Sequence, residues 1–380
     1  MKIKVAIVLG TRPEAIKLVP VYLELKKNSA FDVTLISTGQ HASMLRQIFD
    51  FFGIIPDVEL DVMQPNQTLS SLTSILFNKI GEFFVDNRFD YVLVQGDTTT
   101  AFVAAVSAHY YKFSLVHVEA GLRTNNKWAP FPEECNRKMI SAIADIHFTP
   151  TEMASDNLRM EKITDNVIDV GNTIIDSLLL TISAIDKNKE KYEKKLSALI
   201  NADKKTILVT GHRRESFDKG LGEISKALLS IVDNYPDTRI IYPVHMNPNV
   251  RKIVHAKLGK NENIKLIDPM PYDELIYIMR KCWLVMTDSG GIQEEAPTLN
   301  LPVIVMRDST ERMEAVENGC SLLSGTSSEN ILTQFERIIG SSELYEKMAV
   351  CVNPYGKGGA SRLIVEFLEN HSLNVNVMVE

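Results

Sequence analysis

Acidic side chains recur in this chain directly after apolar segments. Asp97 follows the segment 91–95, Glu119 follows the apolar run that ends at Val118, and Glu133 opens a helical pattern behind two prolines. Carboxylates can remove and return a proton as a general base and a general acid. Their joint occurrence makes these three residues candidates for moving a proton at a carbon atom of a sugar.

Each acid also has a structural explanation, which the residues alone leave open. Asp97 or Thr98 could cap a helix, and Glu119 could form an ion pair with Arg123. Glu133 lies in the first turn of a predicted helix, where a negative charge is favoured by the helix macrodipole.

Basic side chains follow other apolar segments. The turn at 10–17 reads Gly-Thr-Arg-Pro-Glu-Ala-Ile-Lys, and the segment at 211–215 reads Gly-His-Arg-Arg-Glu. A helix N-terminus offers backbone N–H groups to an anion, and the planar guanidinium of Arg12 matches phosphate oxygens. Cations that are placed in advance stabilise the charge growing on a departing pyrophosphate. We therefore expect a phosphate site, although solvated surface turns would carry the same residues.

The second half of the chain adds polar groups at similar positions. Ser289-Gly290-Gly291 follows an apolar run, so that backbone N–H groups could approach a phosphate, and Glu295 could reach a ribose diol. His245 and Asn247 end another such run. The alternative for residues 289–295 is a plain capped helix.

Strand and helix patterns alternate along the chain and would position these groups. This alternation predicts two doubly wound parallel sheets, and ligands bind outside the carboxyl ends of such strands. The predicted strands are 4–9, 33–37, 91–95, 115–118, 146–149 and 167–170, then 206–210, 239–244, 264–267, 284–287 and 302–306. The predicted helices are 14–27, 43–52, 69–85, 100–111, 133–144, 152–161, 172–185 and 362–369.

The length of 380 residues suggests two domains. We expect a Rossmann-like domain over 1–171, a connecting helix and linker over 172–205, and a second Rossmann-like domain over 206–359. The helix 360–380 could pack on either domain.

Composition narrows the class of protein. The net charge of −7 disfavours nonspecific nucleic-acid binding. No secretory pattern and no apolar run of about 20 residues occurs, so we expect a cytoplasmic protein that does not bind membranes. The four scattered cysteines predict free thiols, without a metal site or a disulfide framework. Dinucleotide and P-loop fingerprints are missing, and we expect no cofactor.

Five motifs occur in one order: residues 10–17, Gly-Asp-Thr-Thr-Thr at 96–100, His-Val-Glu-Ala-Gly-Leu-Arg-Thr at 117–124, residues 211–215, and Ser-Gly-Gly-Ile-Gln-Glu-Glu at 289–295. Together they resemble the non-hydrolysing UDP-N-acetylglucosamine 2-epimerases. The resemblance implies a GT-B type fold, in which two Rossmann-like domains flank an interdomain cleft, and a homodimer. It implies that the second domain binds UDP and that the helix 360–380 joins the first domain. It also implies interconversion of UDP-GlcNAc and UDP-ManNAc by anti elimination of UDP to 2-acetamidoglucal and re-addition, which supplies ManNAc-type sugars for bacterial surface polysaccharide.

The resemblance also assigns roles to residues. As catalytic groups it implies Asp97, Glu119, Glu133 and His212; as binding groups for the UDP-sugar it implies Arg12, Lys17, Arg213, His245, Asn247, Ser289, Gly290, Gly291, Glu295 and Arg312. Gln40, His41 and Gln67 match a segment that helps to bind a second UDP-GlcNAc as activator, with an ordinary polar loop as the alternative.

Two positions depart from the family pattern. Phe131 stands where tryptophan is common and Met313 stands where proline is usual, which leaves the specificity for the sugar open. The alternatives are a hydrolysing relative that releases ManNAc and UDP, an epimerase of a modified UDP-HexNAc, a glycosyltransferase that shares the fold, and a UDP-sugar sensor without catalysis.

Overall fold

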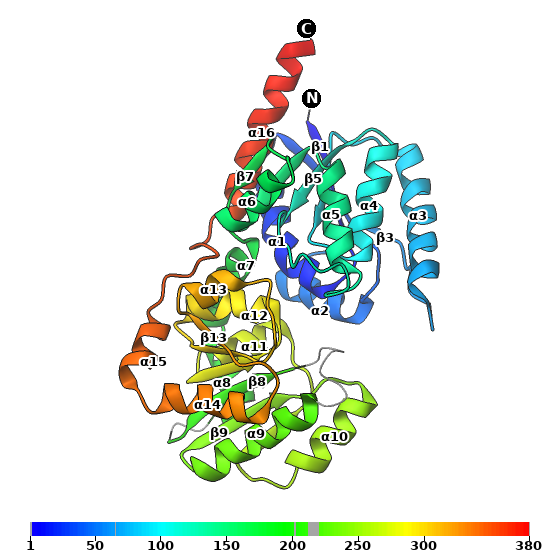
Figure 1. The fold of residues 1–380 in the computed structure, drawn as a ribbon. Coiled ribbons are helices and arrows are strands. Elements are labelled where there is room, and N and C mark those ends of the chain that lie inside the picture. Colours follow the sequence, from blue (N-terminus) through cyan, green and yellow to red (C-terminus); the bar gives the residue numbers. More distant parts are fainter. Residues whose placement is uncertain (1, 65, 201–202, 212–219, 380) are drawn as a thin grey trace. The chain divides into compact units, whose positions relative to one another are not determined.

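The computed structural model describes residues 2–64, 66–200, 203–211 and 220–379, the last seven by their backbone only. The chain divides into two compact units: unit 1 comprises Met1–Ser177 and Tyr355–Glu380, and unit 2 comprises Leu178–Pro354 (Figure 1). Much of the segment 172–205 is helical, as α7 (Thr173–Lys187) and α8 (Lys189–Leu196). The boundary between the units therefore lies inside α7.

Unit 1 contains one parallel sheet with the strand order β3-β2-β1-β4-β5-β6-β7. Its strands are β1 (Ile3–Leu9), β2 (Phe31–Ser37), β3 (Val58–Glu59), β4 (Tyr91–Gln95), β5 (Ser114–Val118), β6 (Ile146–Thr149) and β7 (Val167–Asp169). The strand order reverses between β1 and β4, and ligands of doubly wound sheets bind at such a point.

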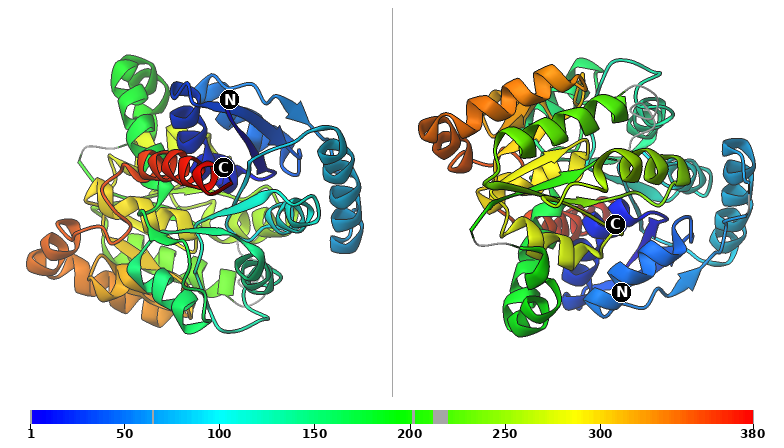
Figure 2. Two further views of the ribbon diagram at one scale, coloured as in Figure 1. Left: turned by 90° about the horizontal axis from the view of Figure 1, so that it is seen from above. Right: turned by 90° about the horizontal axis from the view of Figure 1, so that it is seen from below.

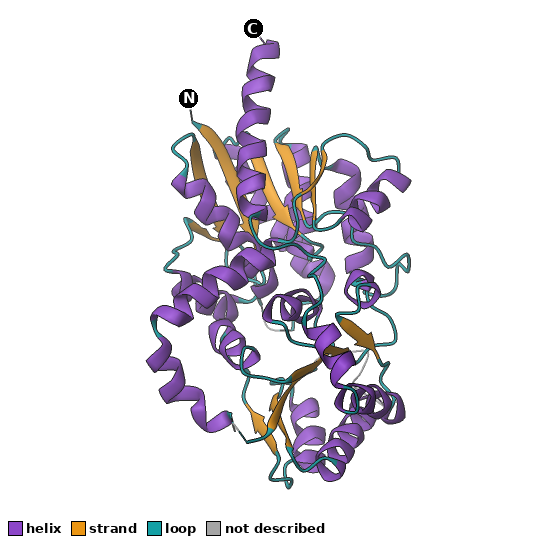
Figure 3. Cartoon of the chain, turned by 90° about the vertical axis from the view of Figure 1, so that its left-hand side faces the viewer, coloured by secondary structure: helices purple, strands orange, loops and turns teal. Residues whose placement is uncertain are grey.

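Helices cover both faces of this sheet, as Figure 3 shows with helices in purple and strands in orange. They are α1 (Arg12–Lys27), α2 (Ala42–Phe52), α3 (Leu69–Asp86), α4 (Thr99–Tyr110), α5 (Glu133–Ile143), α6 (Glu152–Met160), α7 and α16 (Ala360–Val379). Ala6 and Val8 of β1 share a core with α3, α4 and α5. Because side chains alternate along a strand, the buried Val5, Ile7 and Leu9 face the opposite side.

Helix α16 belongs to unit 1 although it ends the chain, and it contacts α1. The side chain of Asn28 donates to Glu369 Oε2 at 2.7 Å, and Phe367 packs edge-on against Phe148 with ring centroids 5.5 Å apart. Asp176 accepts hydrogen bonds from the backbone N–H of Gly359 and, at 2.9 Å, from that of Ser361. These contacts fix both ends of the helix's first half to unit 1.

Unit 2 contains a second parallel sheet with the order β10-β9-β8-β11-β12-β13, which reverses between β8 and β11. The strands are β8 (Lys205–Thr210), β9 (Thr238–Pro243), β10 (Ile264–Ile267), β11 (Leu284–Thr287), β12 (Val303–Val305) and β13 (Ser321–Leu323). The helices besides α8 are α9 (Gly220–Asn234), α10 (Pro248–Leu258), α11 (Tyr272–Met279), α12 (Gly290–Glu295), α13 (Met313–Glu317), α14 (Ser328–Ile339) and α15 (Ser342–Ala349).

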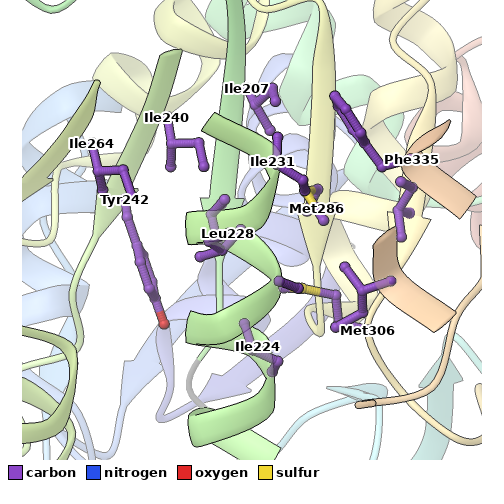
Figure 4. Close-up of a cluster of buried hydrophobic side chains, with 14 of the residues drawn as sticks. Ile207, Ile224, Leu228, Ile231, Ile240, Tyr242, Ile264, Met286, Met306 and Phe335 are labelled. Atoms are coloured by element: carbon purple, nitrogen blue, oxygen red, sulfur yellow. The ribbon is translucent and has the colours of Figure 1, made fainter. Parts of the chain in front are cut away.

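One apolar core joins α9, α10 and α14 to the sheet of unit 2. Figure 4 shows Leu228 and Ile231 of α9 between strand residues such as Ile207 and Met286, with Phe335 of α14 beside them. Two doubly wound parallel sheets were predicted, and the strand orders confirm them. The short strands β3 and β13 were not predicted.

The expectation of four free thiols is wrong for two cysteines. Cys320 and Cys351 form a disulfide, with their Cα atoms 5.5 Å apart, whereas Cys135 and Cys282 are free. Residues 31 apart in the sequence meet because the loop after α15 returns to the start of β13, a tertiary contact that spacing does not reveal. Among the described residues, no helix has the length and hydropathy to cross a bilayer.

Candidate functional site

The turn after β1 is held by a buried carboxylate. Glu14 Oε2 accepts the backbone N–H groups of Gly10 at 3.0 Å and Thr11 at 2.7 Å, and its Oε1 accepts the hydroxyl of Thr98 at 2.7 Å. Burial raises the pKa of Glu14 above its usual value. We expected the backbone N–H groups of this turn to face a phosphate. For the N–H groups of Gly10 and Thr11 this expectation is wrong, because both donate to the Glu14 carboxylate.

Arg12 begins α1 and lies near the loop that contains Gln40 and His41. The pKa of His41 is lowered mainly by burial of the imidazole, and further by the positive charge of Arg12. Gln40 accepts a hydrogen bond from the Thr100 hydroxyl at 2.9 Å. Gln67 lies before α3, and its side-chain amide donates to the backbone oxygen of Val62 at 3.0 Å.

Lys17 and Glu119 form a buried ion pair between α1 and the end of β5. The second carboxylate oxygen of Glu119 accepts a hydrogen bond from the side chain of Gln95, and the backbone of Glu119 has a φ of 63°. The alternative partner considered from the sequence, Arg123, pairs instead with Glu161 at 2.7 Å. Glu119 is therefore held by groups from two other elements.

Asp97 follows β4 and is held by α5. Its Oδ2 accepts two hydrogen bonds from the guanidinium of Arg137, from Nε at 3.0 Å and from Nη2, and its backbone oxygen accepts one from Asn136 at 2.9 Å. Of the two helix caps considered from the sequence, Asp97 and Thr98, it is Thr98 that caps α4. Asp97 and Glu119 thus follow the adjacent strands β4 and β5 at the carboxyl edge of the sheet.

Glu133 is the first residue of α5 and is half-buried. It follows the bend made by the cis peptide bonds before Pro130 and Pro132. The next residue, Glu134, is fully buried and pairs with Arg137 at 3.2 Å. Of the two neighbouring acids, one is therefore locked in a structural ion pair, and Glu133 is the more accessible one.

In unit 2, Ser289, Gly290 and Gly291 follow β11 as predicted, and α12 begins at Gly290. A Cβ atom on Gly290 would lie 2.6 Å from Cζ of Arg312, so the guanidinium packs closely against the start of this helix where glycine has no side chain. Arg312 is buried and pairs with Glu294 at 2.9 Å and with Glu311. The structure thus brings Arg312 to the helix start that the sequence singled out.

Glu295 is buried at the end of α12, where it accepts a hydrogen bond from the hydroxyl of Tyr272. Burial and this carboxylate raise the pKa of Tyr272, which keeps the phenol protonated. Asn247 caps α10 with its side chain, which accepts the N–H of Asn249 at 2.9 Å, and the N–H of Asn247 donates to His245 Nδ1 at 3.2 Å. His212 and Arg213 lie outside the described residues.

Several groups around these sites were missed from the sequence. Arg137 and Glu134 support Asp97, Gln95 supports Glu119, and Glu14 closes the turn after β1. Glu14 could have been found from its spacing, because Thr11 and Glu14 form a capping box. Among the described residues, no group of three or more His, Cys, Asp or Glu could hold a metal ion.

Comparison with known proteins gives one consistent family. The family model described as UDP-N-acetylglucosamine 2-epimerase matches residues 23–369. The UDP-N-acetylglucosamine 2-epimerase of Escherichia coli K12 is 44% identical over 376 residues, which are 98% of this chain and 100% of the relative. That of Bacillus subtilis is 45% identical over 371 residues, 97% of this chain and 96% of the relative.

Solved structures agree with the sequence matches. The UDP-GlcNAc 2-epimerase of Neisseria meningitidis, crystallised with UDP-GlcNAc, has a TM-score of 0.94 at 43% identity and covers 97% of this chain and 100% of its own. The Methanocaldococcus jannaschii enzyme, in complex with UDP-GlcNAc and UDP, has a TM-score of 0.87 at 33% identity with the same coverage. The two doubly wound sheets are those of a GT-B type fold. This chain belongs to the UDP-N-acetylglucosamine 2-epimerase family.

Proposed function

We propose that this protein is a non-hydrolysing UDP-N-acetylglucosamine 2-epimerase, an isomerase that interconverts UDP-GlcNAc and UDP-ManNAc. The observation that carries the proposal is the pair of carboxylates at the carboxyl ends of adjacent strands. Asp97 follows β4, Glu119 follows β5, and each is fixed by a cationic side chain from another element. Two fixed carboxylates are what an acid–base exchange at carbon needs.

The reaction explains why both acids and cations are needed. The C2–H of the sugar is not next to a carbonyl group and is poorly acidic, so cleavage of the C1–O bond must help its removal. One carboxylate takes the C2 proton, the C1–O pair leaves with UDP, and 2-acetamidoglucal forms. Re-addition of UDP at C1, with a proton delivered to the other face of C2, completes the exchange.

We assign the acid and base roles to Asp97, Glu119 and Glu133, with His212 beside the pyrophosphate. The UDP-sugar contacts are assigned to Arg12, Lys17, Arg213, His245, Asn247, Ser289, Gly290, Gly291, Glu295 and Arg312. The position of Ser289, Gly290 and Gly291 directly after β11, at the carboxyl edge of a doubly wound sheet, supports a nucleotide-binding surface in unit 2. The protein needs no cofactor for this reaction.

Incubation of the purified protein with UDP-GlcNAc alone in D2O tests the proposal. We expect UDP-ManNAc to appear with deuterium at C2. Free ManNAc and UDP would instead indicate the hydrolysing reaction, turnover only with an added acceptor would indicate a glycosyltransferase, and binding without chemistry would indicate a sensor. NMR of the reaction mixture distinguishes the four outcomes, and a comparison with modified UDP-HexNAc substrates identifies the preferred sugar.

Neutralising the acids tests their assignment. Asp97→Asn and Glu119→Gln should lower kcat by about 100-fold or more, because acid–base groups act on the barrier. UDP should still bind, as measured by calorimetry. Glu152→Gln, at an exposed carboxylate of α6 in the same unit, is the control and should keep full activity. Near-normal kcat in both test variants would remove the two residues from the mechanism.

The same proposal includes a homodimer, a second UDP-GlcNAc as activator, and a cytoplasmic enzyme that supplies ManNAc-type sugars for surface polysaccharide. Light scattering tests the dimer. The activator is tested by the dependence of the rate on the UDP-GlcNAc concentration, which should be sigmoidal in the wild type and lose this shape in Gln40→Ala.

Cell fractionation tests the location. The location is of interest because disulfides such as Cys320–Cys351 are rare in reducing compartments.

A further inference from the structure

A buried ionic triad lies beside the proposed acid–base group Asp97. Arg137 of α5 is at its centre: Nε and Nη2 donate to Asp97 Oδ2, the former at 3.0 Å, and Nη1 donates to Glu134 Oε2 at 3.2 Å. The side chains of Arg137 and Glu134 are 5% and 1% exposed, whereas that of Asp97 is 23% exposed. Only the aspartate end of the triad therefore reaches the surface of unit 1.

Within the triad, Asp97 uses its Oδ2 to accept hydrogen bonds, and its Oδ1 is available for another partner. Both hydrogen bonds from Arg137 go to Oδ2, and among the described residues Oδ1 accepts none. The backbone near Asp97 is fixed as well, because Asn136 donates to the Asp97 carbonyl at 2.9 Å and the buried His117 bonds to the Gly96 carbonyl at 2.8 Å. Two donors fixed in the plane of one guanidinium hold Oδ2 in place more rigidly than a single ammonium group would.

Glu134 connects the triad to the loop in front of α5. Its Oε2 accepts the backbone N–H of Thr124 at 3.0 Å, and its Oε1 accepts that of Asn125 at 2.9 Å. Its own N–H donates to the Pro130 carbonyl at 3.2 Å. The carboxylate of Glu134 thus holds the start of the loop that leads to Glu133, and the backbone of Glu134 holds the part of the loop at Pro130. Through Arg137 the same residue joins that loop to Asp97.

We infer that Arg137 is a positioning residue for Asp97, with Glu134 as its anchor. Arg137 turns the Asp97 carboxylate so that Oδ1 is the oxygen that exchanges a proton with C2 of the substrate. It balances the negative charge on Oδ2 and, through α5, holds Asp97 at a fixed position relative to Glu133. The inference rests on the proposed epimerase function and adds to it the support of one acid–base group.

Substitution of Arg137 tests the inference, with the wild-type protein measured first for C2 deuterium exchange in UDP-GlcNAc. We expect kcat of Arg137→Lys and Arg137→Ala to fall by about 100-fold, the effect of a misplaced reacting group, while KM changes little. Methylguanidinium added at millimolar concentration should restore part of the kcat of Arg137→Ala. A role in folding alone would not give rescue of kcat in a protein whose circular dichroism is already native.

A double substitution separates positioning from an independent role. If Arg137 acts through Asp97, Asp97→Asn/Arg137→Ala is no slower than Asp97→Asn alone. Glu161→Gln is the matched control, because it breaks the ion pair of the neighbouring buried arginine, Arg123, and should leave kcat unchanged.

The outcomes are distinct. An inactive wild-type protein would refute the proposed function and this inference with it. An active wild type with full kcat in folded Arg137→Lys would refute the inference alone. That variant keeps the positive charge and decides the question even where Arg137→Ala does not fold.

Discussion

Gly10 illustrates how much the turn after β1 depends on one missing side chain. A Cβ atom at this position would lie 2.3 Å from Thr38 Oγ1 and 2.4 Å from Thr100 Oγ1, and both threonines are fully buried. These hydroxyls are 3.1 Å apart and join β2 to α4 directly beneath the turn. Glycine is therefore required here by close packing rather than by an unusual φ.

Replacement of this glycine should destabilise the protein. For Gly10→Ala we expect a loss of about 1–3 kcal/mol in the free energy of unfolding, because extra atoms in a packed core force a shift of the backbone. Gly81→Ala is the matched control: its Cβ would meet its nearest neighbour, the Tyr111 hydroxyl, at 3.6 Å. It lies inside α3 and should gain up to about 1 kcal/mol from helix propensity. Urea titration measures both; equal stability of the two variants would contradict the packing argument.

At the scale of elements, two buried histidines make the junction of β5 and β6 sensitive to acid. His117 and His147 lie opposite each other in the sheet register, and both are buried. Burial lowers the pKa of His117 to about 3 and that of His147 to about 4. Both side chains are therefore neutral in the folded protein at pH values where the unfolded chain already binds protons.

The stability of unit 1 should fall as the pH decreases. Below pH 6.5 the unfolded state takes up protons on these histidines and the folded state does not, so each contributes a loss of about 2 kcal/mol between pH 7 and pH 5. His117→Gln can still donate to the Gly96 carbonyl and should remove about half of this loss. His109→Gln, at an exposed histidine of α4, should leave it unchanged. Urea titrations across this pH range measure the slope, and a pH-independent wild type would contradict the argument.

The same elements show what the sequence could and could not predict. The strands 91–95, 146–149, 264–267 and 284–287 have the predicted bounds, because they are apolar runs between clear turns. The two residues of β3 carry no such pattern. The acids at the carboxyl ends of strands were found by their position, whereas the partner of Asp97, Arg137, lies 40 residues away and is set by how α5 packs.

At the scale of the whole molecule, the last helix is a structural part of the first unit. Leu368 of α16 is fully buried, whereas Leu363 on the same helix is 43% exposed. We expect Leu368→Ala to cost about 2–5 kcal/mol and Leu363→Ala less than about 1 kcal/mol. In a Trp128→Phe background, the fluorescence of Trp283 follows unit 2 separately and should report little change for either variant. An equal cost for both leucines would mean that α16 does not belong to the core of unit 1.

Because α16 packs on unit 1, unit 1 contains segments that the ribosome makes before and after unit 2. Unit 2 lies entirely within Leu178–Pro354, so all its residues are available before the end of the chain is translated. Unit 1, which begins the chain and carries Asp97 and Glu119, acquires its last packing partner only when residues 360–371 have left the ribosome. The half of the protein that is made first thus depends on a segment that is made later, and a chain broken off before α16 lacks the helix that packs on α1 and against Phe148.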